Sequence, residues 1–125
     1  MSWRYFKREE FTCKCGCGQT LIEDTFIDKL DDLRDKCGFP LQVTSGYRCP
    51  THNDRVSSTG LTGPHTTGRA ADFLVSRSNA YDTVKYALLM GFTGIGVNQK
   101  GSGRFIHVDD LPNGPNQPRC TIWSY

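Results

Sequence analysis

Two short segments of this chain carry side chains that could together hold a metal ion. The first, HTTGRAAD, begins with His65 and ends with Asp72, and the second, FIHVD, contains His107. Two imidazoles and one carboxylate form an open ligand set that suits a divalent ion such as zinc and leaves one position for water. Zinc lowers the pKa of a bound water from about 15.7 toward about 7, so such a site would produce a nucleophile at neutral pH.

The surroundings of Asp72 support a special role for its carboxylate. It lies in an apolar run, residues 70–75, which we interpret as a buried strand. A carboxylate in such a strand is costly unless it is paired or bound to a metal. Spacing alone leaves two explanations open, because Asp72 could instead pair with Arg48 or Arg69.

Hydrophobic periodicity predicts two helices. The first is expected to start at a capping box formed by Thr20 and Glu23 and to end at Gly38. The second is expected from Ser78, as its N-cap, to about Met90. Each helix has an apolar face, which we expect to pack against a sheet.

Five segments have the alternation or apolar content of strands: 41–44, 70–75, 94–97, 104–109 and 120–125. The late strands follow one another through short connections, which favours a small antiparallel sheet flanked by helices, an α+β fold. Because side chains alternate along a strand, His107 and Asp109 should share one face. The polar stretch 45–64 is expected to be a long loop, and such loops are usually functional or mobile.

Size and composition indicate one domain. The 125 residues are 37% apolar, which is enough for a single core. We divide the chain into an N-terminal cysteine-rich arm, residues 1–20, and one domain, residues 21–125. A net charge of +2 without a basic run argues against nucleic-acid binding, and no apolar run is long enough to span a membrane. We expect a monomer.

Four motifs of this sequence resemble those of the zinc D-Ala-D-Ala carboxypeptidase family, which shares its fold with the hedgehog signalling domain and the vancomycin-resistance D,D-dipeptidases. They are SGYRCPTHN at 45–53, His-x-x-Gly-x-Ala-x-Asp at 65–72, Gly-Ile-Gly at 94–96 and FIHVD at 105–109. The similarity is strongest to small phage and prophage members, which often begin with a Phe-x-Cys-x-Cys-Gly segment like residues 11–16. It covers most of the chain, from about residue 11 to residue 109.

The resemblance implies a hedgehog/D,D-peptidase-like fold and a zinc-dependent peptidase. The substrate would be the stem peptides of peptidoglycan, cleaved as by a D,D-carboxypeptidase or an endopeptidase of the endolysin kind. The matching positions make His65, Asp72 and His107 the ligands of Zn²⁺.

The loop motif supplies the expected substrate-binding residues. Arg48 matches an active-site arginine of the family, and its guanidinium could clamp a substrate carboxylate or stabilise an oxyanion. A structural ion pair is the alternative role for Arg48. Tyr47 and His52 belong to the same loop and are expected to contact substrate, although His52 could equally cap a local turn.

The sequence departs from the family pattern at two positions. Many members carry a Glu or Asp as general base three residues before the last histidine ligand, where this chain has Arg104, which cannot accept a proton. Asp109 is the nearest substitute, either as the proton acceptor or as a group that orients His107. A small hydroxyl residue common two positions before the first ligand is replaced by Gly63. A non-catalytic zinc-containing module that binds the cell wall or serves a structural role therefore stays the alternative function.

The six cysteines raise a separate question. Cys13, Cys15 and Cys17 would face the same way on an extended strand, and with Cys37 or Cys49 they could bind a second, structural zinc. A disulfide to the first helix and free thiols that act as small apolar groups are the other interpretations. A thiol-based redox or metal-storage protein is a third, less favoured function.

The first ten residues, MSWRYFKREE, lack the apolar stretch of a signal peptide. We therefore expect synthesis in the cytoplasm, followed by release through another agent and action on the bacterial cell wall. A phage or prophage enzyme would behave in this way.

Overall fold

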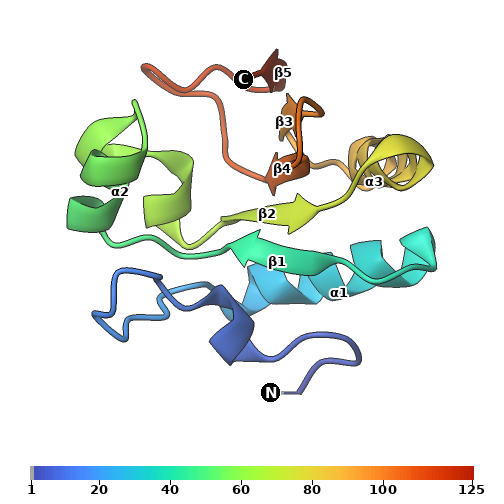
Figure 1. Ribbon diagram of the computed structural model, residues 1–125, viewed down its shortest axis with the longest axis horizontal. Coiled ribbons are helices and arrows are strands. Elements are labelled where there is room, and N and C mark those ends of the chain that lie inside the picture. The colour runs from blue at the N-terminus through green and yellow to red at the C-terminus, as the bar shows by residue number, and fades with distance from the viewer. Residues whose placement is uncertain (1) are drawn as a thin grey trace.

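Five strands form one sheet in the order β1-β2-β4-β3-β5. Figure 1 shows the computed structural model, which describes residues 2–125. All neighbouring strands are antiparallel except β3 and β5, which are parallel. The predicted α+β fold with a mostly antiparallel sheet is confirmed. The strands are β1 (Gln42–Ser45), β2 (Ala70–Leu74), β3 (Gly94–Asn98), β4 (Phe105–Asp109) and β5 (Thr121–Ser124).

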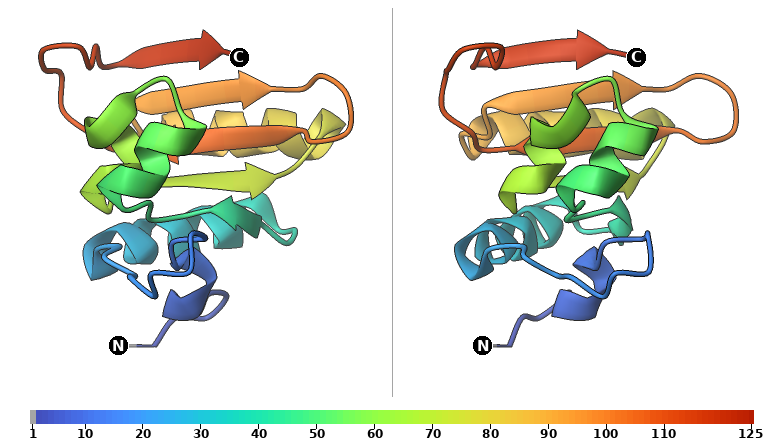
Figure 2. Two further views of the ribbon diagram at one scale, coloured as in Figure 1. Left: turned by 60° about the vertical axis from the view of Figure 1, so that its left-hand side comes forward. Right: turned by 90° about the vertical axis from the view of Figure 1, so that its left-hand side faces the viewer.

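Helices cover both faces of the sheet (Figure 2). Two longer helices, α1 (Asp24–Cys37) and α3 (Arg77–Leu89), lie on one side, and the short α2 (Pro50–Val56) lies on the other. Two 3₁₀ turns, η2 (Gly60–Thr62) and η3 (Pro64–Thr67), follow α2. The prediction of a plain loop over residues 45–64 is therefore wrong: proline at the first helical position presets the backbone angle and starts α2.

The ends of α1 only partly follow the sequence prediction. The helix begins at Asp24, so the capping box expected at Thr20 does not form. The Thr20 hydroxyl is instead 2.8 Å from the hydroxyl of Thr12 in the preceding segment. The predicted stop is present, since Gly38 adopts the left-handed conformation with φ of 75° that ends many helices.

The two faces of the central strands have different chemistry because successive side chains alternate. Ala71 and Phe73 of β2 and Ile106 and Val108 of β4 belong to the main core, which also includes apolar side chains of α1 and α3. Fully burying a side chain such as Phe73 contributes about 1.5–3 kcal/mol. The opposite face of the same strands carries polar residues, and this face positions the site.

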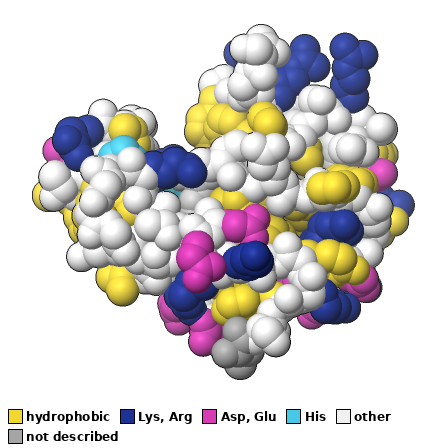
Figure 3. Space-filling model, turned by 60° about the horizontal axis from the view of Figure 1, so that its bottom comes forward, with side chains coloured by type: hydrophobic (Ala, Val, Ile, Leu, Met, Phe, Trp, Pro, Cys, Tyr) yellow, Lys and Arg dark blue, Asp and Glu magenta, His cyan; other side chains and the backbone are white. Residues whose placement is uncertain are grey.

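The segment before α1 packs against the rest of the molecule through aromatic rings. Phe6 and Phe11 lie in the main core, and the Phe6 ring centroid is 6.0 Å from that of Phe73. The Arg4 guanidinium binds the carboxylate of Asp31 on α1. Basic and acidic side chains lie next to one another in the lower part of the face in Figure 3. Among the described residues, no helix combines the length and apolar character needed to cross a bilayer.

Candidate metal centre

The three predicted ligands converge on the polar face of the sheet. Asp72 and His107 are direct partners across the β2–β4 ladder, so their side chains leave the same face next to each other. His107 Nδ1 lies 3.0 Å from Asp72 Oδ1. His65, from η3, brings its Nε2 to 3.2 Å from the same oxygen and 3.3 Å from His107 Nδ1. All three side chains are buried.

The donor set fits zinc in both spacing and protonation. Ligand bonds of about 2.0–2.1 Å in a tetrahedral site put neighbouring donor atoms about 3.3 Å apart, close to the spacing found here. His65 Nδ1 is 2.8 Å from the carbonyl oxygen of Gly46, which can only accept a hydrogen bond. That contact puts the ring proton on Nδ1 and leaves the Nε2 lone pair facing Asp72 and His107. Residues His65, Asp72 and His107 could therefore hold the ion.

The second imidazole is held in the same manner by Asp109. His107 Nε2 lies 2.7 Å from Asp109 Oδ2, so the proton on Nε2 is donated away from the centre and Nδ1 is left for the metal. Arg119 donates two hydrogen bonds to this carboxylate, from Nε at 2.9 Å and from Nη2 at 2.8 Å. Sequence reasoning missed Arg119, because nothing in the loop before β5 marks it as a partner of β4.

Burial and the neighbouring polar groups have opposite effects on the pKa of two carboxylates, those of Asp72 and Asp109. Burial raises the pKa of Asp72, but the two imidazoles beside its carboxylate, those of His65 and His107, outweigh burial and hold the pKa well below its ordinary value. Burial also raises the pKa of Asp109, and hydrogen bonds from His107 and Arg119 outweigh it, so that the pKa falls to about 2. Both groups are thus anionic at neutral pH, as metal ligation and support of a ligand require.

A cleft of about 630 Å³ opens over the centre. Arg48 reaches it from the segment between β1 and α2. Its Nε donates to Ser45 Oγ at 3.2 Å and its Nη1 donates to Asn53 Oδ1 at 3.0 Å. Its Nη2 lies 3.8 Å from Asp72 Oδ2, so the guanidinium stands beside the centre. The cleft is lined by Arg48, Val56, Ser57, Ser58, Thr59, Pro64, His65, Asp72, Phe105, His107, Trp123, Ser124 and Tyr125.

Two aromatic residues, Trp123 of β5 and Tyr125 directly after it, complete one wall of the cleft. The ring centroids of Trp123 and His107 are 5.0 Å apart, and Tyr125 lines the same cleft. Gly96 makes room for both, because a Cβ there would lie 2.8 Å from Trp123 Nε1 and from the Tyr125 hydroxyl. Burial raises the pKa of Tyr125, so its hydroxyl stays a proton-bearing donor at neutral pH. Alternation along residues 121–125 puts Trp123 and Tyr125 on one face, but the sequence does not show which strand they join.

The other residues of the loop motif lie outside the cleft. Tyr47 is buried and packs against Cys13 and Cys49. His52 is half-buried on α2. Within residues 2–125, the side chains that line the cleft include neither Tyr47 nor His52.

The structure shows what surrounds Arg104 and Gly63, the two residues that depart from the family pattern. Arg104 precedes β4, and its Nε donates to the carbonyl oxygen of Gly101 at 3.0 Å in the exposed turn after β3. Gly63 lies just before η3, where a Cβ would be only 2.0 Å from Thr59 Oγ1. A side chain at position 63 would require the side chains of Thr59 and Asn53 to move.

Comparison with known proteins agrees with this geometry. A family model described as Peptidase M15 matches residues 4–109, which include Arg48, His65, Asp72 and His107. The matched part ends before β5, so the aromatic wall of the cleft lies beyond it. The search of curated proteins found no match. Because the family model covers most of the chain, the protein belongs to the peptidase M15 family, the zinc D-Ala-D-Ala carboxypeptidases.

Proposed function

We propose that this protein is a zinc-dependent peptidase that hydrolyses peptide bonds in the stem peptides of peptidoglycan, as a D,D-carboxypeptidase or an endopeptidase. The observation that carries the proposal is the convergence of His65, Asp72 and His107 beneath a cleft, with the outer nitrogen of each imidazole already engaged. A cleft of about 630 Å³ is of the size that holds small ligands and short peptides.

Each residue around the centre would have a different role in amide hydrolysis. When bound, zinc supplies a Lewis acid and an activated water at neutral pH. The Arg48 guanidinium, beside Asp72, can pair with a terminal carboxylate of the substrate or with the oxygen on which charge develops. The Tyr125 hydroxyl, which also lines the cleft, offers a neutral donor. Asp109 fixes the orientation of His107.

The role of Asp109 follows from the side of the ring that it contacts. A proton acceptor must come within hydrogen-bond reach of the attacking water, about 2.6–3.2 Å or through one further water. Asp109 is fully buried and its two oxygens are occupied by His107 and Arg119. We therefore assign Asp109 the orienting role and not that of general base.

We also propose where the enzyme works. It would be made in the cytoplasm, released by another agent and then act as a monomer on the bacterial cell wall, as a phage or prophage endolysin does. The support is the Phe-x-Cys-x-Cys-Gly segment at residues 11–16, which resembles the start of small phage members of the family.

A second candidate function is a zinc-containing module that binds the wall without cutting it. One observation favours it: among the described residues that line the cleft, Asp72 is the only carboxylate, and Arg104 stands where many relatives have an acid. A site that retains its metal ligands but lacks a base would bind a peptide and leave it intact.

Incubation of the zinc-loaded protein with purified peptidoglycan separates the two functions. A peptidase releases new amino groups, and His107→Ala abolishes the release because a metal ligand is lost. A binding module sediments with the wall but produces no amino groups. The Cys120→Ser variant, altered at an exposed residue outside the centre, is the matched control and should behave as the wild type.

A further inference from the structure

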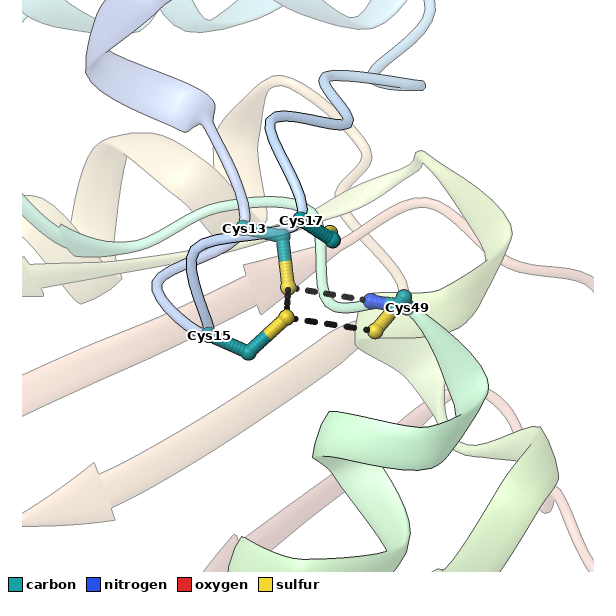
Figure 4. Close-up of side chains that lie close together, drawn as sticks. All are labelled: Cys13, Cys15, Cys17 and Cys49. Carbon is teal, nitrogen blue, oxygen red and sulfur yellow. Dashed lines mark hydrogen bonds between the residues drawn. The ribbon is translucent and has the colours of Figure 1, made fainter.

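Four cysteines from two separate segments meet away from the metal centre (Figure 4). Cys13, Cys15 and Cys17 come from the loop before α1, and Cys49 directly precedes α2. Their four sulfur atoms lie within 4.8 Å of one another. The Sγ atoms of Cys13 and Cys15 are 3.5 Å apart, and those of Cys15 and Cys49 are 3.6 Å apart. All four residues are free thiols in this structure.

The spacing of the sulfur atoms suits a tetrahedral thiolate site. Zinc–sulfur bonds of about 2.3 Å put the corners of a tetrahedron about 3.8 Å apart. The distances from Cys15 to Cys13 and Cys49 are close to this value. Figure 4 shows the sulfurs of these three residues turned toward one another. Cys37 and Cys120 lie elsewhere, so of the two fourth ligands that the sequence allows, the structure selects Cys49.

A tight turn, and not an extended strand, brings the arm cysteines together. On an extended strand, alternate residues are about 6.6–6.8 Å apart, too far for one ion to reach three successive sulfurs easily. Gly16 and Gly18 adopt positive φ values of 90° and 76°, which fold the segment back. The turn is closed by the Cys13 N–H, which donates to the carbonyl oxygen of Gln19 at 2.9 Å.

The second segment is attached to this turn by backbone contacts. The Cys49 N–H donates to Cys13 Sγ at 3.3 Å, a contact that favours a negatively charged sulfur. The Tyr47 N–H donates to the carbonyl oxygen of Phe11 at 2.9 Å. A Cβ on Gly46 would lie 2.6 Å from the Phe11 Cα, so the two backbones touch there. The four thiols are thus held by two segments that already pack closely.

We infer that Cys13, Cys15, Cys17 and Cys49 bind a structural zinc ion as thiolates, separate from the His65–Asp72–His107 centre. The thiols release their protons to solvent as the ion binds. The ion joins the N-terminal segment to the loop that carries Arg48, whose backbone N–H donates to the carbonyl oxygen of His65 at 3.0 Å. A second ion would therefore stabilise the loop that positions both a cleft residue and a ligand.

Metal analysis of protein purified in a reducing buffer with zinc tests this inference. The wild type should contain two zinc ions per chain, and the His65→Ala/His107→Ala variant should retain one. In that variant, X-ray absorption at the zinc edge should show only sulfur neighbours at about 2.3 Å and no nitrogen or oxygen at 2.0–2.1 Å. A thiol-specific mercurial should release one of the two ions from the wild type.

Variants of the cluster provide the complementary measurement. Cys17→Ser alters the exposed member of the cluster and should reduce the zinc content from two ions to one. Cys120→Ser, also exposed, is the matched control and should retain two. If Cys17→Ser does not fold, the mercurial titration of the wild type still decides.

Three results would overturn the inference. The mercurial could release no zinc from the wild type, or the cluster variants could keep two zinc ions per chain. Intact mass could also show disulfides among the four cysteines and no second ion. None of these depends on peptidase activity. Failure of the peptidase proposal would instead appear as intact peptidoglycan with a normal zinc content.

Discussion

The carboxylate of Asp109 lies 2.7 Å from Nε2 of His107, while Nδ1 of the same ring faces Asp72 and His65. One imidazole therefore separates Asp109 from the proposed metal position. Arg119 neutralises this carboxylate with two hydrogen bonds, so Asp109 is fixed in place. The arrangement is that of a metal ligand with a carboxylate behind it, which sets the tautomer and raises the basicity of the ring.

Replacing Asp109 by Asn keeps the shape of the side chain but removes its charge. We expect zinc affinity or peptidase rate to fall about 10–100-fold, as is usual for partners of metal-bound histidines. Competition with a chelator and release of amino groups measure the two quantities. The neighbouring Asp110→Asn is the matched control, because Asp110 pairs with Arg69 and Lys29 instead of the centre. Unchanged affinity and rate in Asp109→Asn would contradict the orienting role.

Gly94 leaves the space in which this carboxylate lies. A Cβ at position 94 would be 2.3 Å from Asp109 Oδ1 and 2.4 Å from Oδ2. Gly94→Ala should therefore displace Asp109, lower zinc affinity as Asp109→Asn does, and cost about 1–3 kcal/mol of unfolding free energy. Gly103→Ala, where the added atom meets open space, should stay within about 0.5 kcal/mol of the wild type. Equal effects of the two substitutions in denaturant unfolding would refute this explanation of Gly94.

Asp110 makes stability depend on pH. Burial raises the pKa of Asp110, but hydrogen bonds from Arg69 and Lys29 outweigh it and lower the pKa below its ordinary value. The stabilisation is therefore present above the unfolded pKa of about 3.9 and is lost as pH falls through the lower folded value. Asp110→Asn should cost about 1–3 kcal/mol at pH 7 and progressively less below pH 4. Denaturant unfolding at several pH values checks this, and an equal cost at all of them would contradict it.

Phe11 tests whether the N-terminal segment is an arm or part of the core. Its side chain is fully buried in the main cluster, next to Phe6. Phe11→Ala should cost about 3–5 kcal/mol, because it leaves a cavity in packed surroundings. Leu21→Ala, at a residue that is 61% exposed, serves as the control and should cost far less. Similar costs for the two substitutions would mean that residues 1–20 are an appended arm.

The closeness of Asp72 and His107 could be predicted in part from the sequence, because it depends on strand alternation and on the pairing of neighbouring strands. Alternation fixes which face of a strand a side chain occupies, and the antiparallel pairing of neighbouring strands then brings Asp72 and His107 together. The same pattern puts Asp109 on the face of His107. It does not say on which side of the imidazole ring the carboxylate lies, because that depends on the rotation of His107 and on the contact with Arg119.

The features that sequence reasoning missed depend on distant contacts or lack an apolar pattern. Strand β5 pairs in parallel with β3 across more than twenty residues of chain, and this pairing brings Trp123 and Tyr125 to the cleft. Helix α2 has seven mainly polar residues, so it shows no apolar stripe that periodicity could detect. The turn at Gly16 and Gly18 replaces the extended strand that alternate cysteines suggest.

The Tyr125 hydroxyl should act as a neutral donor in the cleft. Tyr125→Phe removes only this group, so we expect zinc content to stay normal while the rate of peptide hydrolysis falls roughly tenfold, a loss that corresponds to one hydrogen bond of about 1.4 kcal/mol. Kinetics with a synthetic stem peptide measure the change. A rate equal to that of the wild type would show that β5 shapes the cleft without contributing a donor.

Mass analysis of peptidoglycan digested by the zinc-loaded protein tests the proposed function most directly. We predict stem-peptide fragments in which one peptide bond has been hydrolysed with the gain of one water, and no such fragments with the His107→Ala variant. Intact stem peptides after digestion by wild-type protein that carries zinc in the His65–Asp72–His107 centre would contradict the peptidase function and favour a binding module.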